Sequence, residues 1–179
     1  MKRINLILLI SIFQLHQSFA QTNWSERMAD AMMEVHKDSI TYKEAGKFAR
    51  WDYEQAILLK ALERVWYRTG DAKYYRFILK NVDAFVNEKG EIKSYKGEQF
   101  NIDNITGGRI LLMLYRESGK GKFKLAADLL RNQLRNQPRT KEGGFWHKQI
   151  YPNQMWLDGL YMGEPFYAEY SKADRKSVV

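Results

Sequence analysis

The sequence predicts an all-α protein built from helical hairpins. Apolar residues recur at spacings of three and four over several long segments, which is the period of an amphipathic helix. Glycines stand where these segments stop, and two of the segment pairs resemble each other. The sequence contains no glycine-rich phosphate loop and no strand-turn-helix unit, which disfavours a nucleotide-binding sheet.

The first residues of the chain have the pattern of a signal peptide. Lys2 and Arg3 are followed by an almost unbroken apolar run, 4–13, and by Ser18-Phe19-Ala20, which is typical of a cleavage site. An uncleaved membrane anchor is the alternative, but this run is shorter than the roughly 20 residues needed to cross a bilayer. We therefore expect a signal peptide over 1–20 and an exported protein, periplasmic or extracellular, with no membrane span in its mature part.

Composition narrows the classes of partner. The chain has 179 residues, a formal charge of +8 and no cysteine, so no disulfide framework is expected. Part of the positive charge belongs to the signal peptide, and the rest alternates with acidic residues along helical segments, as on a solvated surface. No basic stripe stands out, so a nucleic-acid partner is not expected. A weak attraction for anionic sugars remains open.

The expected helices follow from the apolar period and its stops. They cover 24–39, 52–69, 71–86 with a stop at Gly90, 105–118, 122–136, and a last segment from about Trp156 toward Tyr170; 91–104 is expected to be a loop. Two hairpins share a Tyr-Arg ending and a glycine turn, one at 67–71 and one at 115–119. A helix-loop-helix unit that repeats at about 50 residues predicts a helical array or a toroid of hairpins.

Two acidic groups stand at expected helix starts. Asp52, followed by Tyr53, opens a helix, where an acid is favoured by the helix dipole; a substrate-facing role is equally open. Asn101, Asp103 and Asn104 precede another helix, and capping of that helix is the favoured interpretation when this group is taken alone.

A third group, at 143–162, is richer in chemistry. Asp158 lies among Trp156, Leu157, Leu160 and Tyr161, and a carboxylate partly desolvated by such neighbours holds a proton near neutral pH and can act as a general acid. His147 precedes it, and the surrounding aromatic residues can form platforms for sugar rings. No second histidine or cysteine stands at ligand spacing, so no metal and no cofactor is expected. No serine or cysteine nucleophile signature is present.

These residues resemble a known family. The runs Phe145-Trp146-His147-Lys148 and 154–162 with Pro165-Phe166, together with Ile102-Asp103-Asn104 and Gly107, closely resemble glycoside hydrolase family 105, the unsaturated rhamnogalacturonyl hydrolases, and more distantly family 88. The resemblance extends from about Trp24 to Tyr170. It implies a six-hairpin α/α barrel, of which this chain supplies about the first half.

The resemblance also implies a reaction and a set of roles. Such enzymes remove a 4,5-unsaturated uronic acid from oligosaccharides made by polysaccharide lyases, of rhamnogalacturonan or pectin type, by hydrating its vinyl ether. By similarity Asp158 is the general acid and base, and Asp103 holds sugar hydroxyls or tunes Asp158. The implied substrate-binding residues are Asp52, Tyr53, His147, Lys148 and Trp156.

The domain boundaries follow from these patterns. We expect a partial α/α-barrel glycoside hydrolase domain over 21–173 and a non-native tail over 174–179, because the tail departs from the helical pattern and from the family. A partial toroid leaves hairpin faces uncovered, so these residues alone are expected to be poorly soluble and inactive. A non-enzymatic helical-repeat protein that binds a polysaccharide or a protein is the alternative function. That alternative needs the aromatic residues but not Asp158.

Overall fold

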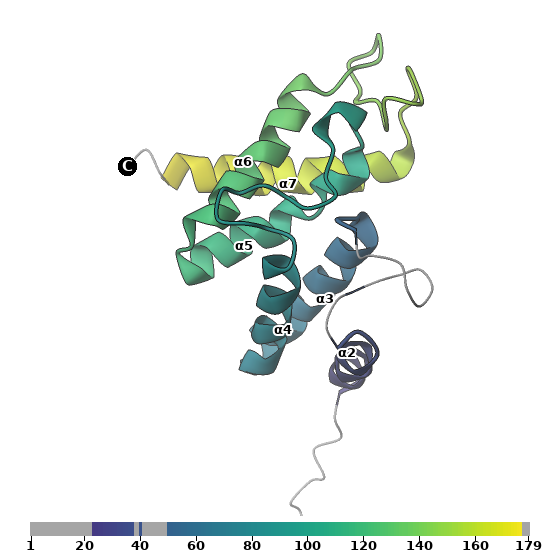
Figure 1. Ribbon diagram of the computed structural model, residues 1–179. Coiled ribbons are helices and arrows are strands. Elements are labelled where there is room, and N and C mark those ends of the chain that lie inside the picture. Colours follow the sequence, from purple (N-terminus) through teal and green to yellow (C-terminus); the bar gives the residue numbers. More distant parts are fainter. Residues whose placement is uncertain (1–22, 38–39, 41–49, 177–179) are drawn as a thin grey trace, which may run out of the picture.

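The computed structural model describes residues 23–37, 40 and 50–176; the expected signal peptide and residues 177–179 lie outside these ranges. Over the described residues the chain is helical, with two isolated β-bridges and no strand (Figure 1). This confirms the predicted all-α class. The elements are α2 (Trp24–Val35), α3 (Tyr53–Thr69), α4 (Ala72–Asp83), the 3-10 turns η1 (Gly97–Gln99) and η2 (Ile102–Ile105), α5 (Gly108–Ser118), α6 (Gly121–Asn136) and α7 (Leu157–Lys176).

The two predicted hairpins are α3–α4 and α5–α6. Asp52 caps α3, and α3 ends at Gly70, whose left-handed backbone has φ of 70°. Gly119 ends α5 in the same way, with φ of 69°. A glycine adopts this conformation without the steric cost of a side chain, so both hairpins turn on the same local device.

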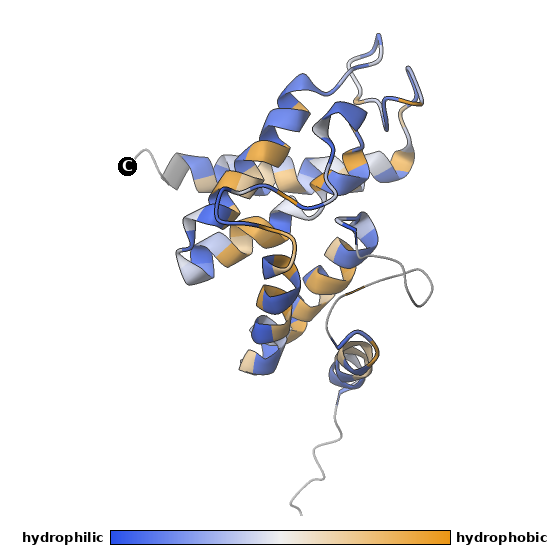
Figure 2. Cartoon of the chain, in the orientation of Figure 1, coloured by the Kyte–Doolittle hydropathy of each residue, from blue (hydrophilic) through white to orange (hydrophobic). Residues whose placement is uncertain are grey.

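The first helices of successive hairpins lie next to each other. α3 packs on α5 and α5 packs on α7, while α4 and α6 each pack on the first helix of their own hairpin and α2 packs on α3. The middle of α5, Ile110 to Leu114, is buried from both sides. Figure 2 shows the hydrophobic residues as stripes along α3 and α5, which is the pattern of helices that bury one face against neighbours.

Several boundaries differ from the expected ones, and the first is the end of α2, which lies at Val35 instead of residue 39. α4 ends at Asp83 rather than near Gly90, because Val86 forms an antiparallel bridge with Ile92 and turns the chain back. The expected loop at 91–104 contains η1 and most of η2. α7 continues to Lys176, so the first residues of the tail that was expected to leave the helical pattern extend the helix.

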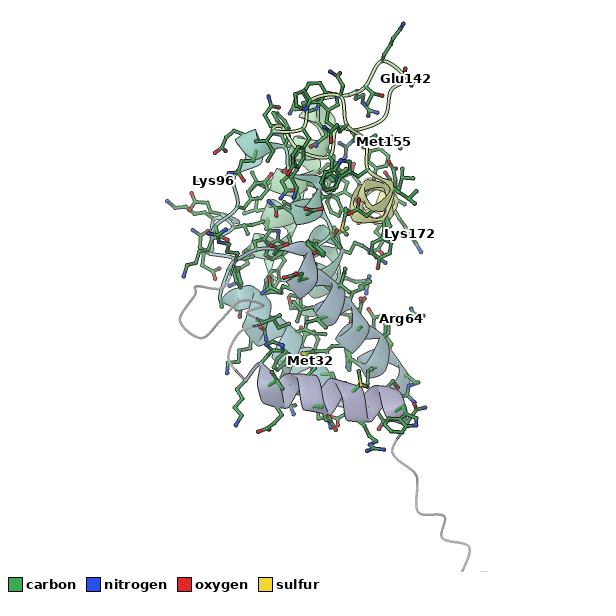
Figure 3. The ribbon with its side chains drawn as sticks, turned by 90° about the vertical axis from the view of Figure 1, so that its right-hand side faces the viewer. Met32, Arg64, Lys96, Glu142, Met155 and Lys172 are labelled. Atoms are coloured by element: carbon green, nitrogen blue, oxygen red, sulfur yellow. The ribbon has the colours of Figure 1, made fainter. Side chains whose placement is uncertain are left out.

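The helix α2 and the loop between α6 and α7 lie at opposite ends of the molecule. Figure 3 shows Met32 of α2 at one end and Glu142, in the loop between α6 and α7, at the other. A groove of about 840 Å³ between α2 and α3 is lined largely by apolar side chains, among them Met28, Met32 and Val65. None of the helices in the described part of the chain is both long enough and apolar enough to cross a membrane.

Candidate active site

Three segments meet at the start of α7: the turn η2, the loop 137–156 and the first turn of the helix. The peptide group of His147 joins the first two, because its carbonyl accepts from the N–H of Ile102 at 3.0 Å. Its own N–H donates to the carbonyl of Gln154 at 2.8 Å. His147 is thereby fixed beside η2, although it lies more than forty residues away in the sequence.

Two buried glutamines, Gln133 in α6 and Gln137 directly after this helix, hold the loop against η2. Gln133 donates to the carbonyl of Asn101 at 3.1 Å. Gln137 donates to the carbonyls of Phe100 and Trp146, at 2.6 and 2.8 Å. Sequence reasoning missed this pair. The sequence signal for the pair is its spacing of four residues, which places the Gln137 amide one helical turn beyond that of Gln133. Both amides lie next to the buried apolar positions of α6.

A chain of charged and polar side chains runs through the site. The Lys148 ammonium lies 2.8 Å from Oδ2 of Asp103, and Oδ1 of Asp103 lies 3.3 Å from Nε2 of His147. Nδ1 of His147 lies 4.0 Å from Oδ1 of Asp158. The structure therefore brings together four of the predicted site residues from three separate segments.

Asp103 is free for this role because another residue caps the turn. The side chain of Asn101 accepts from the Asp103 N–H at 3.1 Å, as an N-cap does. The carboxylate of Asp103 is buried and turned toward His147 and Lys148. The capping interpretation thus holds for Asn101 and not for Asp103.

Asp158 is more exposed than its sequence neighbours predict. Its side chain is 55% exposed, and Leu157, Leu160 and Tyr161 are exposed as well. These apolar residues do not enclose the carboxylate, because this face of α7 is uncovered in the described part of the chain. The expected desolvation of Asp158 is therefore absent here.

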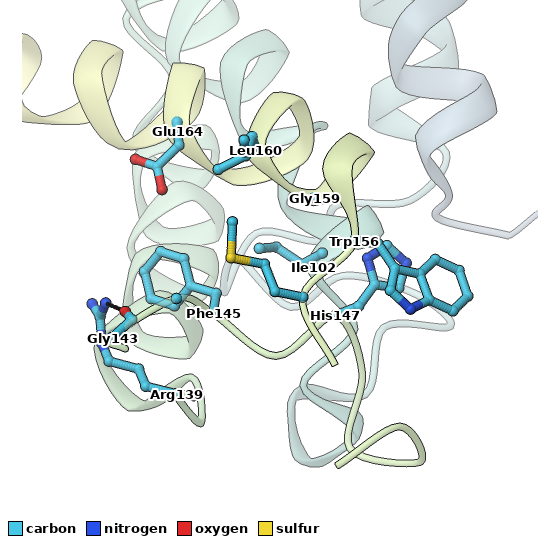
Figure 4. Close-up of a pocket in the computed structure, with 11 residues that line it drawn as sticks. Ile102, Arg139, Gly143, Phe145, His147, Trp156, Gly159, Leu160 and Glu164 are labelled. Carbon is cyan, nitrogen blue, oxygen red and sulfur yellow. Dashed lines mark hydrogen bonds between the residues drawn. The ribbon is translucent and has the colours of Figure 1, made fainter. Parts of the chain in front are cut away.

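Trp156 covers His147 instead of standing alone as a platform. The two rings are stacked, with centroids 4.1 Å apart and planes 13° apart. Tyr151 stacks on the same indole at 5.0 Å. Figure 4 shows the His147 and Trp156 rings lying against each other. At least one face of the indole is thus used to bury the imidazole.

Asp52 and Tyr53 lie on a neighbouring element, the start of α3. Asp52 accepts from the N–H of Tyr53 at 2.6 Å, which is the structural role considered for it. Trp51 ties this end of α3 to η2, because its indole N–H donates to the carbonyl of Asn104 at 2.8 Å. The pKa of Tyr53 is raised, first by the charge of Glu54, then by burial and by the charges of Asp52 and Asp103. The Tyr53 phenol is therefore within electrostatic reach of the site.

One ligand atom each from Asp103, His147 and Asp158 lies within 4.8 Å of the others. These residue types can bind a divalent cation. Here, however, the Lys148 ammonium already neutralises Asp103, and a cation would have to lie beside this positive charge. Lys148, Asp103, His147 and Asp158 thus form a chain of ion-pair contacts, called the ionic chain below, in which Nδ1 of His147 has no hydrogen bond.

A small cavity lies between the loop 137–156 and α7, next to the buried His147 side chain. Its volume is about 60 Å³, and its lining includes Ile102, Phe145, His147, Trp156 and Leu160 (Figure 4). That volume admits a few water molecules and no sugar ring. The side of the site open to a large ligand is the exposed side of Asp158.

Comparison with known proteins yields two findings. Residues 24–177 match the sequence model described as Glycosyl Hydrolase Family 88. The structure also resembles a solved glycoside hydrolase of family 105 from C. acetobutylicum ATCC 824, with a TM-score of 0.74 and 46% sequence identity. The match covers 83% of this chain and 39% of that one, so the chain spans well under half of the solved relative.

Proposed function

Because the chain belongs to glycosyl hydrolase family 88, we propose that it contributes to removing a 4,5-unsaturated uronic acid from the non-reducing end of lyase-generated oligosaccharides. Rhamnogalacturonan or pectin fragments are the proposed source of the substrate. The resemblance to a family 105 enzyme supports this substrate class. The pattern at 1–20 supports export of the protein to the periplasm or beyond the cell.

The proposed reaction is hydration of the vinyl ether. Asp158 protonates C4 of the unsaturated sugar, and water bonds to C5 as its proton passes to the Asp158 carboxylate. The resulting hemiketal opens and releases the rest of the oligosaccharide. The observation that carries this proposal is the ionic chain, in which one carboxylate, Asp158, is exposed to a ligand and the other, Asp103, is buried behind it.

The remaining residues have supporting roles in this proposal. Lys148 neutralises Asp103 and presents positive charge toward an anionic uronate. Trp156 forms a wall of the site, and Tyr53 with Asp52 lies on the neighbouring start of α3. Neither a metal nor a cofactor takes part.

We further propose that these 179 residues alone do not turn the substrate over. The general acid requires a site that is closed to bulk water and admits only the reacting water molecule, whereas Asp158 is 55% exposed here and the first turn of α7 is uncovered. The solved relative is more than twice as long as the part that this chain matches, which supports a requirement for further polypeptide. Turnover by the 179-residue chain would refute this part of the proposal.

The test follows the absorbance of the conjugated uronic acid. The longest product that the gene encodes is assayed on a panel of lyase-generated oligosaccharides, as wild type, as Asp158→Asn and as Glu142→Gln. Glu142 is an exposed carboxylate in the site loop and serves as the matched control. We expect Asp158→Asn to abolish turnover while the circular dichroism spectrum is unchanged, and Glu142→Gln to remain active. Full activity of Asp158→Asn would overturn the assignment and favour the non-enzymatic binding protein.

A further inference from the structure

His147 is inaccessible to a substrate. Its side chain is 1% exposed and lies beneath the indole of Trp156. Lys148 and Asp158, its neighbours in the ionic chain, are partly and largely exposed. A sugar can reach those two residues but not the imidazole, so the expected role of His147 as a substrate-binding residue does not fit its burial.

The charged neighbours of His147 indicate which ring nitrogen carries the proton. Nε2 lies 3.3 Å from Oδ1 of Asp103, whose other oxygen lies 2.8 Å from the Lys148 ammonium. An ionised carboxylate can only accept hydrogen bonds, so we infer from this distance that Nε2 carries the ring proton. In the neutral ring Nδ1 is then an acceptor.

Nδ1 is the atom that lacks a partner. It is buried and makes no hydrogen bond in the described structure, and the nearest carboxylate oxygen is Oδ1 of Asp158, 4.0 Å away. Buried polar atoms are paired in almost all cases, so an unpaired one directed at a site needs a physical account.

Gly159 lies directly against the His147 ring. A Cβ atom at this position would lie 3.4 Å from Nδ1 of His147, which is an ordinary van der Waals distance. The first turn of α7, which carries Asp158, is therefore packed on the side of the imidazole that bears Nδ1.

We propose that His147 is a positioning residue that holds the Asp158 carboxyl group and its proton through Nδ1. The inference rests on the proposed function of Asp158. Between turnovers the Asp158 carboxyl group faces Nδ1 and shares its proton with this nitrogen, which is the stronger base of the two. The carboxyl group then rotates to the substrate with this proton, and its O–H bond breaks as a C4–H bond forms. The Asp158 carboxylate then takes a proton from the water that bonds to C5, and its contact with Nδ1 is restored. His147 neither gains nor loses a proton over the cycle.

The direct test is spectroscopic and needs no turnover. The longest gene product is labelled with ¹⁵N, the ring signals of His147 are assigned through its backbone, and spectra are recorded at about pH 8, above the ordinary range of imidazole titration. We expect the ring proton of His147 on Nε2, and an Nδ1 signal that moves in Asp158→Asn but not in Glu142→Gln. A neutral ring with its proton on Nδ1 instead of Nε2, or an Nδ1 signal unaffected by Asp158→Asn, would overturn the proposal.

A second test uses two isosteres in the longest gene product. Asparagine places its amide near the position of Nδ1, and glutamine places its amide near that of Nε2. We expect His147→Gln to lower kcat about 100-fold with little change in KM, as misplacement of a catalytic group does, and His147→Asn to retain more of kcat. A raised KM with unchanged kcat would instead mean direct substrate binding and would contradict the proposal.

The two tests separate this inference from the proposed function. If Asp158→Asn abolishes turnover but leaves the Nδ1 signal unchanged, the proposed reaction is supported and the proposed role of His147 is contradicted. Asp158 is exposed, so its variant keeps the fold and the spectroscopic test remains decisive even if both His147 variants unfold.

Discussion

Lys148 stabilises the buried carboxylate of Asp103 in this site. Asp103 is almost fully buried on η2, and its two oxygens face the Lys148 ammonium and the His147 ring. A buried charge is costly unless it is paired, so the two partners offset the loss of hydration at Asp103. The side chain of Lys148 is itself 26% exposed, which leaves its charge accessible from outside.

Replacing Lys148 tests this pairing. Lys148→Met removes the ammonium and leaves Asp103 with His147 alone, so we expect a loss of about 1–3 kcal/mol in the free energy of unfolding. Lys148→Arg, which keeps the charge, and Lys141→Met, at an exposed position of the same loop, are the matched controls. Urea denaturation monitored by circular dichroism measures all three. A Lys148→Met protein as stable as the wild type would show that the pair contributes nothing.

At the scale of the elements, the start of α3 is locked to η2 by close contact. Trp51 is buried and donates to the carbonyl of Asn104, and the backbone at Gly107 lies directly against the Trp51 ring. A Cβ atom at 107 would lie 2.2 Å from an atom of this indole, which is far inside van der Waals contact. The glycine is therefore required by the approach of two elements that together carry Tyr53 and Asp103.

The corresponding prediction concerns Gly107→Ala. The added methyl group must displace the indole or the backbone, and overpacking of this kind costs about 1–3 kcal/mol. Gly121→Ala is the control, since a Cβ atom there meets no other atom within 4 Å and lies at the start of α6. We expect thermal unfolding to show a lowered Tm for Gly107→Ala and an unchanged or raised Tm for Gly121→Ala. Equal Tm values for the two variants would contradict the proposed packing.

The sequence predicts those elements whose signals are local. Asp52 and Gly70 bound α3 as expected, and Gly119 ends α5, because caps and left-handed glycines act within one helical turn. The predicted end of α4 was wrong because the true end depends on the pairing of Val86 with Ile92. No local sequence pattern indicates this pairing.

The same difference between local signals and contacts of distant segments applies to the candidate site. The residue types were found by motif, but the contact between Asp103 and Asp158 through His147 joins segments far apart in the chain. The burial of His147 and the exposure of Asp158 depend on what covers each side chain, and sequence neighbours do not determine that.

At the scale of the whole molecule, several apolar surfaces lack a covering partner among the described residues. Met28 is 69% exposed beside the groove between α2 and α3, and Leu157 is exposed at the start of α7. Patches of this kind mark places where other polypeptide packs or where association occurs. They lie on α2 and α7, the first and last helices of the described array, which is where neighbouring hairpins of a longer array would be added.

We propose that the site centred on Asp158 adds water across the C4–C5 double bond of an unsaturated uronide. Turnover in D₂O, followed by NMR at early times with the longest gene product, tests it most directly. Because the proton delivered to C4 comes from an exchangeable carboxyl group, we predict a released 5-keto sugar that carries one deuterium, added to a single face of C4. Early accumulation of free uronic acid with its double bond intact and no deuterium at C4 would contradict the account, since it would mean attack at the anomeric carbon.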